Sequence, residues 1–211
     1  MKNFIIFGDS YSTFRGYIPK GYGPYYSEDE TERTDVRHVE ETWWHQLMTE
    51  SGANLVLNDS WSGSTICYTG YENRDCSTSS SFIYRLNKLI DSGFFNENEI
   101  DTVLVFGGTN DSWAGAPVGT LQYSAWKKED LHAVLPAVCC FIDKLKETLP
   151  QARIIVIINS GLKGEITEGM KEACEHYGVE SLQLVNVDKS HSHPTVQGMK
   201  DIREQVAAKI G

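Results

Sequence analysis

Short β-branched segments alternate with longer amphipathic segments along the whole chain, and this alternation limits the possible folds more than any other feature. Each short segment is almost wholly apolar, as a strand covered on both faces must be. Each longer segment carries apolar residues at helical spacing, and several of them stop at a glycine. The expected strands are 3–7, 53–57, 101–106, 153–158 and 182–187, and the expected helices are 42–51, 81–91, 129–148, 165–177 and 195–210. Pro136 is expected to kink the third helix or to mark its true start.

Strand and helix alternating five times predict an α/β fold with a parallel sheet covered by helices on both faces. Because crossovers are right-handed, the natural topology is a three-layer α/β/α sandwich with a flavodoxin-like five-stranded parallel sheet. The sequence contains no repeat, low-complexity tract or linker, so we expect residues 1–211 to form one domain. Segment 11–40 interrupts the alternation of strands and helices. It is expected to be an ordered functional loop because it gathers tyrosines among its glycines and prolines, namely Tyr17, Tyr22, Tyr25 and Tyr26.

Charge and cysteine usage exclude several classes of function. The formal net charge is −10 and no polybasic cluster occurs, which argues against nucleic acid or an anionic membrane as partner. No signal-like segment and no run of 18 apolar residues is present, so a cytoplasmic protein is expected. The five cysteines form no Cys-x-x-Cys pair. They are therefore interpreted as reduced thiols, not as a disulfide framework or a zinc ribbon.

Polar, reactive side chains follow four of the five predicted strands. The carboxyl ends of parallel strands lie at one edge of the sheet, where open α/β folds bind their ligands. We therefore expect these four segments to lie close together although they are far apart in the sequence. They are the turn Gly8-Asp9-Ser10, the loop 60–64 with Gly63, the segment Gly108-Thr109-Asn110-Asp111, and Asp188 with His191 and His193.

These residue types supply every part that an acyl-transfer site requires. A serine hydroxyl becomes a nucleophile when an imidazole takes its proton, and a carboxylate fixes the tautomer of that imidazole. The tetrahedral intermediate needs N–H donors aimed at its oxyanion, each contributing on the order of 3 kcal/mol. The backbone N–H groups of Ser10 and Gly63 and the side-chain amide of Asn110 are the candidate donors.

The same residues resemble a known family. The four segments are Gly8-Asp9-Ser10, Gly63, Gly108-x-Asn110-Asp111 and the C-terminal Asp…His-Pro. In this order, and across residues 5–199, they are similar to the four blocks of the SGNH hydrolases, also called GDSL esterases and lipases. The resemblance implies the SGNH hydrolase fold and ester hydrolysis without a metal or other cofactor. It also implies Ser10 as the nucleophile, with Gly63 and Asn110 in the oxyanion hole. One departure is Tyr11, which stands where the family usually has Leu or Ile.

The last block can be read in two ways. Asp188-Lys-Ser-His191 keeps the usual Asp-x-x-His spacing, whereas His193-Pro194 keeps the His-Pro-x-x-x-Gly context, with a serine where the aspartate is expected. We expect His193 to be the general base, because Pro194 fixes the start of the last helix and holds His193 beside it. Asp188 is then expected to reach His193 across a wider loop. His191 is the alternative base.

The substrate and two other readings of the site stay open. A small or acetylated ester, such as an acetylated carbohydrate, is favoured because the chain is short, has no obvious lid and carries aromatic loops. Trp61, Trp113 and Trp126 are candidates to line the groove. Asp188, His191 and His193 can alternatively be read as zinc ligands. A flavodoxin-like binding module without catalysis, or an inactive relative kept for protein interaction, are further alternatives, and the oligomeric state is left open.

Overall fold

Five parallel strands form the central sheet. The computed structural model describes residues 1–30 and 32–211. Its sheet has the order β2-β1-β3-β4-β5, with every neighbouring pair parallel. This order confirms the predicted flavodoxin-like sheet. The strands are β1 (Asn3–Gly8), β2 (Asn54–Ser60), β3 (Thr102–Gly107), β4 (Arg153–Ile158) and β5 (Glu180–Gln183).

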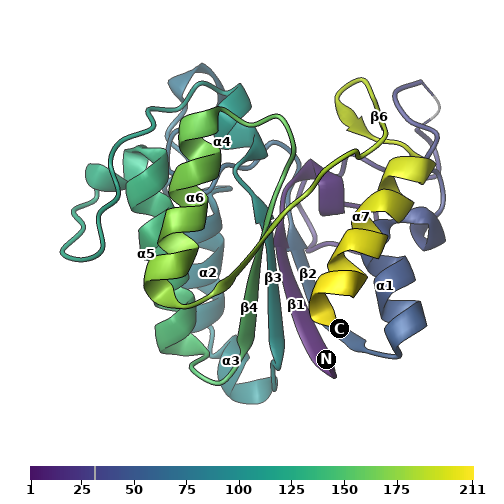
Figure 1. Cartoon of the computed structure of the whole chain (residues 1–211), viewed down its shortest axis with the longest axis horizontal. Coiled ribbons are helices and arrows are strands. Elements are labelled where there is room, and N and C mark those ends of the chain that lie inside the picture. Colours follow the sequence, from purple (N-terminus) through teal and green to yellow (C-terminus); the bar gives the residue numbers. More distant parts are fainter. Residues whose placement is uncertain (31) are drawn as a thin grey trace.

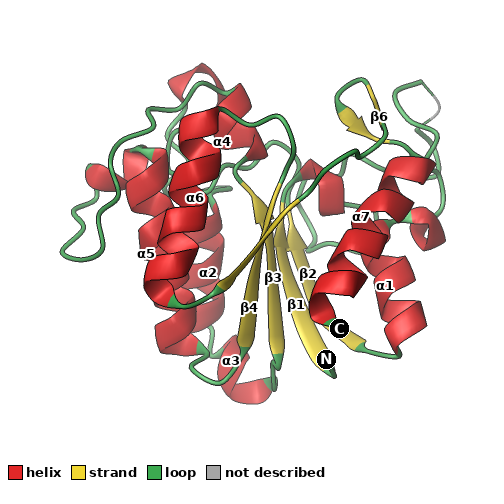
Figure 2. Ribbon diagram, viewed as in Figure 1, coloured by secondary structure: helices red, strands yellow, loops and turns green. Residues whose placement is uncertain are grey.

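Helices cover both faces of the sheet and complete three layers (Figures 1 and 2). One face carries α1 (Trp43–Ser51) and α7 (Val196–Ile210), and the other carries α2 (Phe82–Asp91), α5 (Val134–Thr148) and α6 (Gly164–Tyr177). Two short helices, α3 (Phe94–Glu97) and α4 (Thr109–Trp113), were not expected from the sequence. Short 3-10 turns lie at Ser10–Ser12, Val39–Glu41, Tyr71–Asn73 and Asp130–His132.

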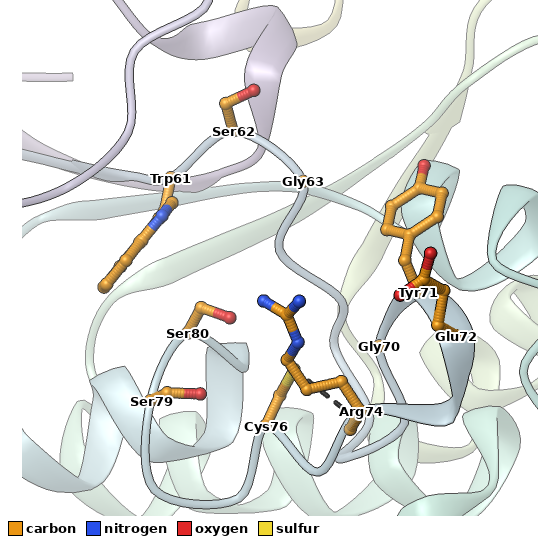
Figure 3. A pocket seen from close by; sticks show the side chains of 10 residues that line it. All are labelled: Trp61, Ser62, Gly63, Gly70, Tyr71, Glu72, Arg74, Cys76, Ser79 and Ser80. Atoms are coloured by element: carbon orange, nitrogen blue, oxygen red, sulfur yellow. Dashed lines mark hydrogen bonds between the residues drawn. The ribbon is translucent and has the colours of Figure 1, made fainter.

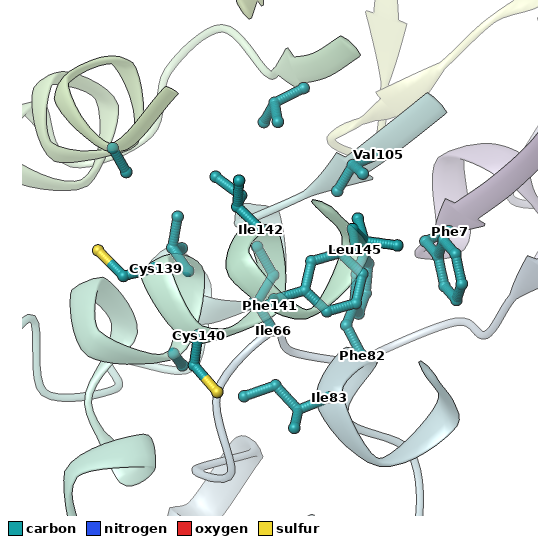
Figure 4. Close-up of a cluster of buried hydrophobic side chains, with 14 of the residues drawn as sticks. Phe7, Ile66, Phe82, Ile83, Val105, Cys139, Cys140, Phe141, Ile142 and Leu145 are labelled. Atoms are coloured by element: carbon teal, nitrogen blue, oxygen red, sulfur yellow. The ribbon is translucent and has the colours of Figure 1, made fainter. Parts of the chain in front are cut away.

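Alternate side chains of the central strands face two separate cores. Ile5 and Phe7 of β1 pack under α2 and α5, whereas Phe4 and Ile6 pack under α1 and α7. Figure 4 shows the first of these cores, in which the rings of Phe7 and Phe141 meet edge to face with their centroids 5.4 Å apart. Because β1 and β3 are buried on both faces, their sequences are continuous apolar runs and not alternating ones.

Two elements differ from the sequence-based expectation. The third long helix begins at Val134, so Pro136 lies in its first turn, where its missing N–H costs no helical hydrogen bond. The fifth strand covers Glu180–Gln183, not 182–187. It is an edge strand whose one neighbour, β4, ends at Ile158, the partner of Gln183, so the ladder has no further backbone to pair with.

A small hairpin precedes the last helix. Its strands are β6 (Lys189–Ser190) and β7 (His193–Pro194), which pair antiparallel. The two residues between them, His191 and Ser192, both have positive φ angles, of 48° and 65°. This is the backbone of a two-residue type I′ turn, which matches the twist of the strands it connects.

No helix among the described residues is long and apolar enough to cross a membrane. All five cysteines are free and buried. Burial raises the pKa of the Cys139 and Cys140 thiols to about 11, so both stay protonated and unreactive near neutral pH.

Candidate active site

Ser10 lies at the carboxyl end of β1, where the chain turns sharply into the 3-10 turn Ser10–Ser12. Asp9 caps this turn, because its Oδ1 accepts a hydrogen bond of 3.1 Å from the backbone N–H of Tyr11. Gly8 is required before it, since a Cβ there would lie 2.4 Å from Oγ of Ser60 on the neighbouring strand. Ser10 itself is only 2 % exposed. The turn therefore presents its hydroxyl at a closely fitted position at the edge of the sheet.

The structure places His193 against Ser10. Nε2 of His193 lies 2.9 Å from Oγ of Ser10, although the two residues are 183 positions apart. His191 does not reach the serine: its ring is exposed, and its Nδ1 lies 3.2 Å from Oγ of the adjacent Ser190. The type I′ turn separates the two imidazoles, because it puts His191 at the tip of the hairpin and His193 on its returning strand.

The other ring nitrogen of His193 contacts a backbone carbonyl. Nδ1 lies 3.1 Å from the carbonyl oxygen of His191. A carbonyl only accepts, so Nδ1 must carry the proton, and Nε2 is left free to accept from the Ser10 hydroxyl. The hairpin thus selects the tautomer that a general base requires.

Within the described residues, Asp188 is not hydrogen-bonded to His193. Its exposed carboxylate accepts a hydrogen bond from the Thr195 hydroxyl instead, and its backbone carbonyl accepts one of 3.2 Å from the Thr195 N–H. Thr195 is the N-cap of α7 and accepts from the N–H of Gly198 at 3.1 Å. The shorter β5 explains this position, because Asp188 follows a stretch of loop and not a strand end. The Asp188 carboxylate therefore stabilises the N-cap residue of the last helix.

Aromatic rings enclose the His193 imidazole. The Tyr25 ring stacks on it with a centroid distance of 3.6 Å and an interplanar angle of 6°. Tyr11 and Trp113 approach from other directions, with centroids 5.4 and 5.8 Å away. These rings hold the imidazole in one plane and keep most of its surface from water.

The tyrosines of segment 11–40 also hold the backbone of the hairpin. The hydroxyl of Tyr11 donates to the carbonyl of Ser192 at 2.6 Å, and the hydroxyl of Tyr26 donates to that of Pro194 at 3.0 Å. The irregular segment after β1 is therefore an ordered part of the site. Tyr11, which stands where the family usually has Leu or Ile, therefore holds the hairpin in place through its hydroxyl.

Burial is the main cause of a lowered pKa at His193. The nearby positive charges of Arg33 and Lys189 lower it further, while the hydrogen bond to the His191 carbonyl opposes the shift. Lys189 is held by Asn159, whose Oδ1 accepts from its Nζ at 3.0 Å. The imidazole is therefore neutral at neutral pH, which is the form that can accept a proton.

The predicted oxyanion donors are fixed at the same edge of the sheet. Gly63 has a φ of 79°, a left-handed conformation that suits glycine. The described residues supply no acceptor for the backbone N–H groups of Ser10 and Gly63. The Asn110 amide is anchored on both sides, because its Nδ2 donates to the Ser64 carbonyl at 3.0 Å and its Oδ1 accepts from the Tyr71 hydroxyl at 2.8 Å. One Nδ2 hydrogen remains free.

Two buried charged residues stabilise this arrangement, and sequence reasoning missed both roles. The Asp111 carboxylate accepts from the backbone N–H groups of Ile66 at 2.9 Å and Cys67 at 3.0 Å, which fixes the loop after Gly63. Arg85 of α2 is fully buried, pairs with Asp59 at 2.6 Å, and also donates to backbone and hydroxyl oxygens of Gly8, Ser64 and Ser80. A signal was present, since Arg85 interrupts the apolar face of its helix.

The three candidate tryptophans lie in different surroundings. Trp113 is 40 % exposed beside His193, and Trp61 stacks on Tyr22 with centroids 4.3 Å apart. Trp126 packs against the core under α5 and donates to the Gln122 carbonyl at 2.7 Å, so it lines no part of this site. The alternative zinc site does not form, because the described part of the chain holds no group of three or more potential metal ligands.

Comparisons with known proteins find a matching family and similar solved structures. The family model for the GDSL-like lipases and acylhydrolases matches residues 2–210. A GDSL-like lipase from Bacteroides uniformis is 46 % identical, with 100 % of this chain and 95 % of that chain covered and a TM-score of 0.92. One from Bacteroides ovatus is 39 % identical, covers 100 % and 98 %, and also has a TM-score of 0.92. None of the curated proteins compared matches the chain.

A more distant structure shares the fold. The acetyl xylan esterase Est2A from Butyrivibrio proteoclasticus is 17 % identical over 99 % of this chain and 63 % of that chain, with a TM-score of 0.62. The agreement at this level of identity concerns the arrangement of the strands and helices.

Proposed function

Since the chain belongs to the GDSL-like lipase/acylhydrolase family, we propose that it is a serine esterase with Ser10 as nucleophile and His193 as general base. One observation carries the proposal, namely the 2.9 Å contact between Oγ of Ser10 and Nε2 of His193. Family membership supports ester hydrolysis as the class of reaction. The roles of the individual residues are inferred from their geometry.

The proposed reaction proceeds through an acyl-enzyme. Ser10 Oγ attacks the ester carbonyl while Nε2 of His193 takes the hydroxyl proton. The N–H groups of Ser10 and Gly63 and the Asn110 amide donate to the oxyanion of the tetrahedral intermediate. His193 then gives its proton to the departing alcohol, which leaves the acyl group on Ser10. A water molecule, deprotonated by the same imidazole, releases the acid and restores the serine.

A backbone carbonyl takes the place of the third catalytic side chain in this proposal. The His191 carbonyl accepts the Nδ1 proton and thereby holds the reactive tautomer of His193. The stacked Tyr25 ring fixes the ring plane. Asp188 is assigned an indirect role, since it holds Thr195 at the start of α7, directly after the strand that carries His193.

A small acyl group fits the position of the nucleophile. Ser10 is 2 % exposed and is enclosed by bulky side chains, so a short acyl chain such as acetyl reaches it with the least rearrangement. We propose an acetylated carbohydrate as the substrate. The aromatic surfaces of Trp61 and Trp113 beside the site support this proposal, as does the common fold with an acetyl xylan esterase.

Short p-nitrophenyl esters and a serine-reactive fluorophosphonate test the proposal. The protein should release p-nitrophenol and should be labelled at Ser10, and both properties should be lost in Ser10→Ala. His193→Ala should lose turnover, whereas His191→Ala, two positions away on the exposed side of the hairpin, serves as the matched control and should keep it. Absence of labelling together with unchanged turnover in Ser10→Ala would overturn the proposal.

A further inference from the structure

A pocket of about 400 Å³ opens beside the proposed oxyanion donors. Its walls come from three segments: 61–63 after β2, the hairpin 69–75 with the following Cys76, and residues 79–80 before α2 (Figure 3). This volume lies within the range of ligand pockets, toward its lower end, and is suited to a single small ring. Trp61 and Tyr71 supply apolar ring surface, and Glu72, Arg74 and three serines supply polar groups. This mixture suits a sugar ring, which has apolar faces and polar edges, better than a fatty acyl chain.

The pocket is connected to the reactive residues through two contacts. Gly63, whose N–H is a proposed oxyanion donor, forms part of its wall. Tyr71 forms another part, and its hydroxyl donates to Oδ1 of Asn110 at 2.8 Å. A substrate whose carbonyl lies against Gly63 and Asn110 therefore extends its remaining part into this space.

The hairpin 69–75 is rigid enough to position a side chain. Thr69 and Asp75 form an antiparallel bridge, and the N–H of Arg74 donates to the Tyr71 carbonyl at 3.1 Å. Between them Glu72 and Asn73 both have left-handed φ angles, of 58° and 56°, as in a two-residue type I′ turn. This turn fixes the backbone from which Arg74 projects.

Arg74 extends its guanidinium into the pocket (Figure 3). No hydrogen bond or ion pair joins this guanidinium to another described residue. Oδ1 of the adjacent Asp75 accepts a hydrogen bond from the N–H of Ser77 at 2.8 Å and not from Arg74. Five other arginines each pair with a carboxylate, namely Arg15, Arg33, Arg85, Arg153 and Arg203. An unpaired guanidinium is thus exceptional in this acidic protein.

Two further donors lie near Arg74. The hydroxyls of Ser79 and Ser80 line the same pocket and have no hydrogen-bond partner among the described residues. A guanidinium flanked by free hydroxyls matches the hydrogen-bonding pattern of a carboxylate, which accepts on both oxygens. An acetyl group is too small to need such a pocket, so the alcohol part of the ester is the fitting occupant.

We propose that this pocket binds the carboxylate of an acylated acidic sugar, and that Arg74 determines this specificity. The inference rests on the proposed esterase function and extends it to the class of alcohol. The carboxylate of a uronic acid ring would lie against Arg74 and the serine hydroxyls while its acetyl ester lies at Ser10. The Trp61 side chain closes the opposite wall of the pocket (Figure 3).

The test compares a mono-acetylated methyl glucuronoside with the equivalent methyl glucoside, which lacks the carboxylate. The wild-type protein should have the higher kcat/KM for the glucuronoside, and Arg74→Ala should lower this value about 10- to 100-fold, mainly through KM. Arg74→Lys should recover part of the loss, since it keeps the charge but not the planar fork. Lys200→Ala, which removes an exposed charge on α7, is the matched control and should keep the preference.

Two readouts separate this inference from the proposed function. Turnover of p-nitrophenyl acetate should depend on Ser10 and be unchanged in the control Lys200→Ala. Methyl glucuronoside should inhibit that turnover in the wild-type protein more strongly than methyl glucoside, which tests the pocket without any variant. Equal kcat/KM for both sugars, or an equal loss for both in Arg74→Ala, overturns the inference while Ser10-dependent turnover remains. Turnover that does not depend on Ser10 overturns the proposed function itself.

Discussion

Replacing Asp188 by asparagine distinguishes a serine–histidine pair from a triad completed by a carboxylate. The nearest acceptor of the His193 Nδ1 proton is the His191 carbonyl at 3.1 Å, and the Asp188 carboxylate is bonded to the Thr195 hydroxyl. Asparagine retains a carbonyl oxygen that can accept from Thr195. The substitution therefore removes a charge without removing the acceptor that selects the tautomer of His193.

The two arrangements predict effects of very different size. Where a carboxylate orients the imidazole directly, its replacement by an amide lowers kcat about 10⁴-fold. Here the change weakens one exposed, charge-assisted hydrogen bond at the N-cap of α7, which costs about 1 kcal/mol of stability. We expect kcat/KM in Asp188→Asn to fall less than about 10-fold, because the contact of Ser10 with His193 does not involve Asp188.

The assay is the rate of p-nitrophenyl acetate hydrolysis, measured together with thermal unfolding to verify that each variant is folded. Asp201→Asn is the matched control, since its carboxylate accepts the backbone N–H of Asp188 at 3.0 Å and lies in the same loop–helix junction. His193→Ala gives the full loss for comparison. If folded Asp188→Asn loses 10³-fold or more while Asp201→Asn does not, Asp188 acts on His193 directly and the carbonyl-based arrangement is refuted.

Three further predictions concern pH and buried charge. Arg33 lowers the pKa of His193, so Arg33→Gln should move the acid limb of the pH profile of kcat/KM, which we place below pH 6.5, toward higher pH. Burial raises the pKa of Asp9 from 3.8 to about 7. The protonated Asp9 carboxyl therefore stabilises the folded protein fully below pH 3.8, and this stabilisation is lost as the pH rises to 7. The melting temperature should decline over this pH range more in the wild type than in Asp9→Asn. Arg85→Met should cost about 3–5 kcal/mol in urea unfolding because it leaves Asp59 buried without its cation, and adding Asp59→Asn should recover most of the loss.

Periodicity predicted the fold well because the central strands are buried on both faces and the helices on one. β1, β3 and β4 read as apolar runs, and the ends of α1 and α6 are marked by left-handed glycines at Gly52 and Gly178. The fifth strand was placed wrongly for a reason that one sequence cannot reveal. Its apolar pattern continues beyond Gln183, but the length of an edge strand depends on how far its neighbour extends.

The candidate site was predictable to the extent that strand ends determine it. Ser10, Gly63, Asn110 and His193 were placed by the positions of their strands and by the family motifs. The surroundings of His193 were not, because the Tyr25 ring and the His191 carbonyl are brought to it by an irregular loop and a two-residue turn. Such contacts leave no periodic pattern in the sequence.

In the proposed mechanism, His193 acts as a base without a hydrogen-bonded carboxylate. A carboxylate fixes the tautomer of the imidazole and stabilises the imidazolium formed during the reaction. The His191 carbonyl supplies the first effect, and the face of the stacked Tyr25 ring supplies part of the second through attraction between a cation and a π system. Arg33, whose guanidinium carbon lies 5.1 Å from the centroid of the Tyr25 ring, opposes a positive charge on His193. The balance of these interactions favours the neutral imidazole, so His193 stays deprotonated under more acidic conditions than an ordinary histidine. The same shift makes His193 a weaker base toward the Ser10 hydroxyl proton.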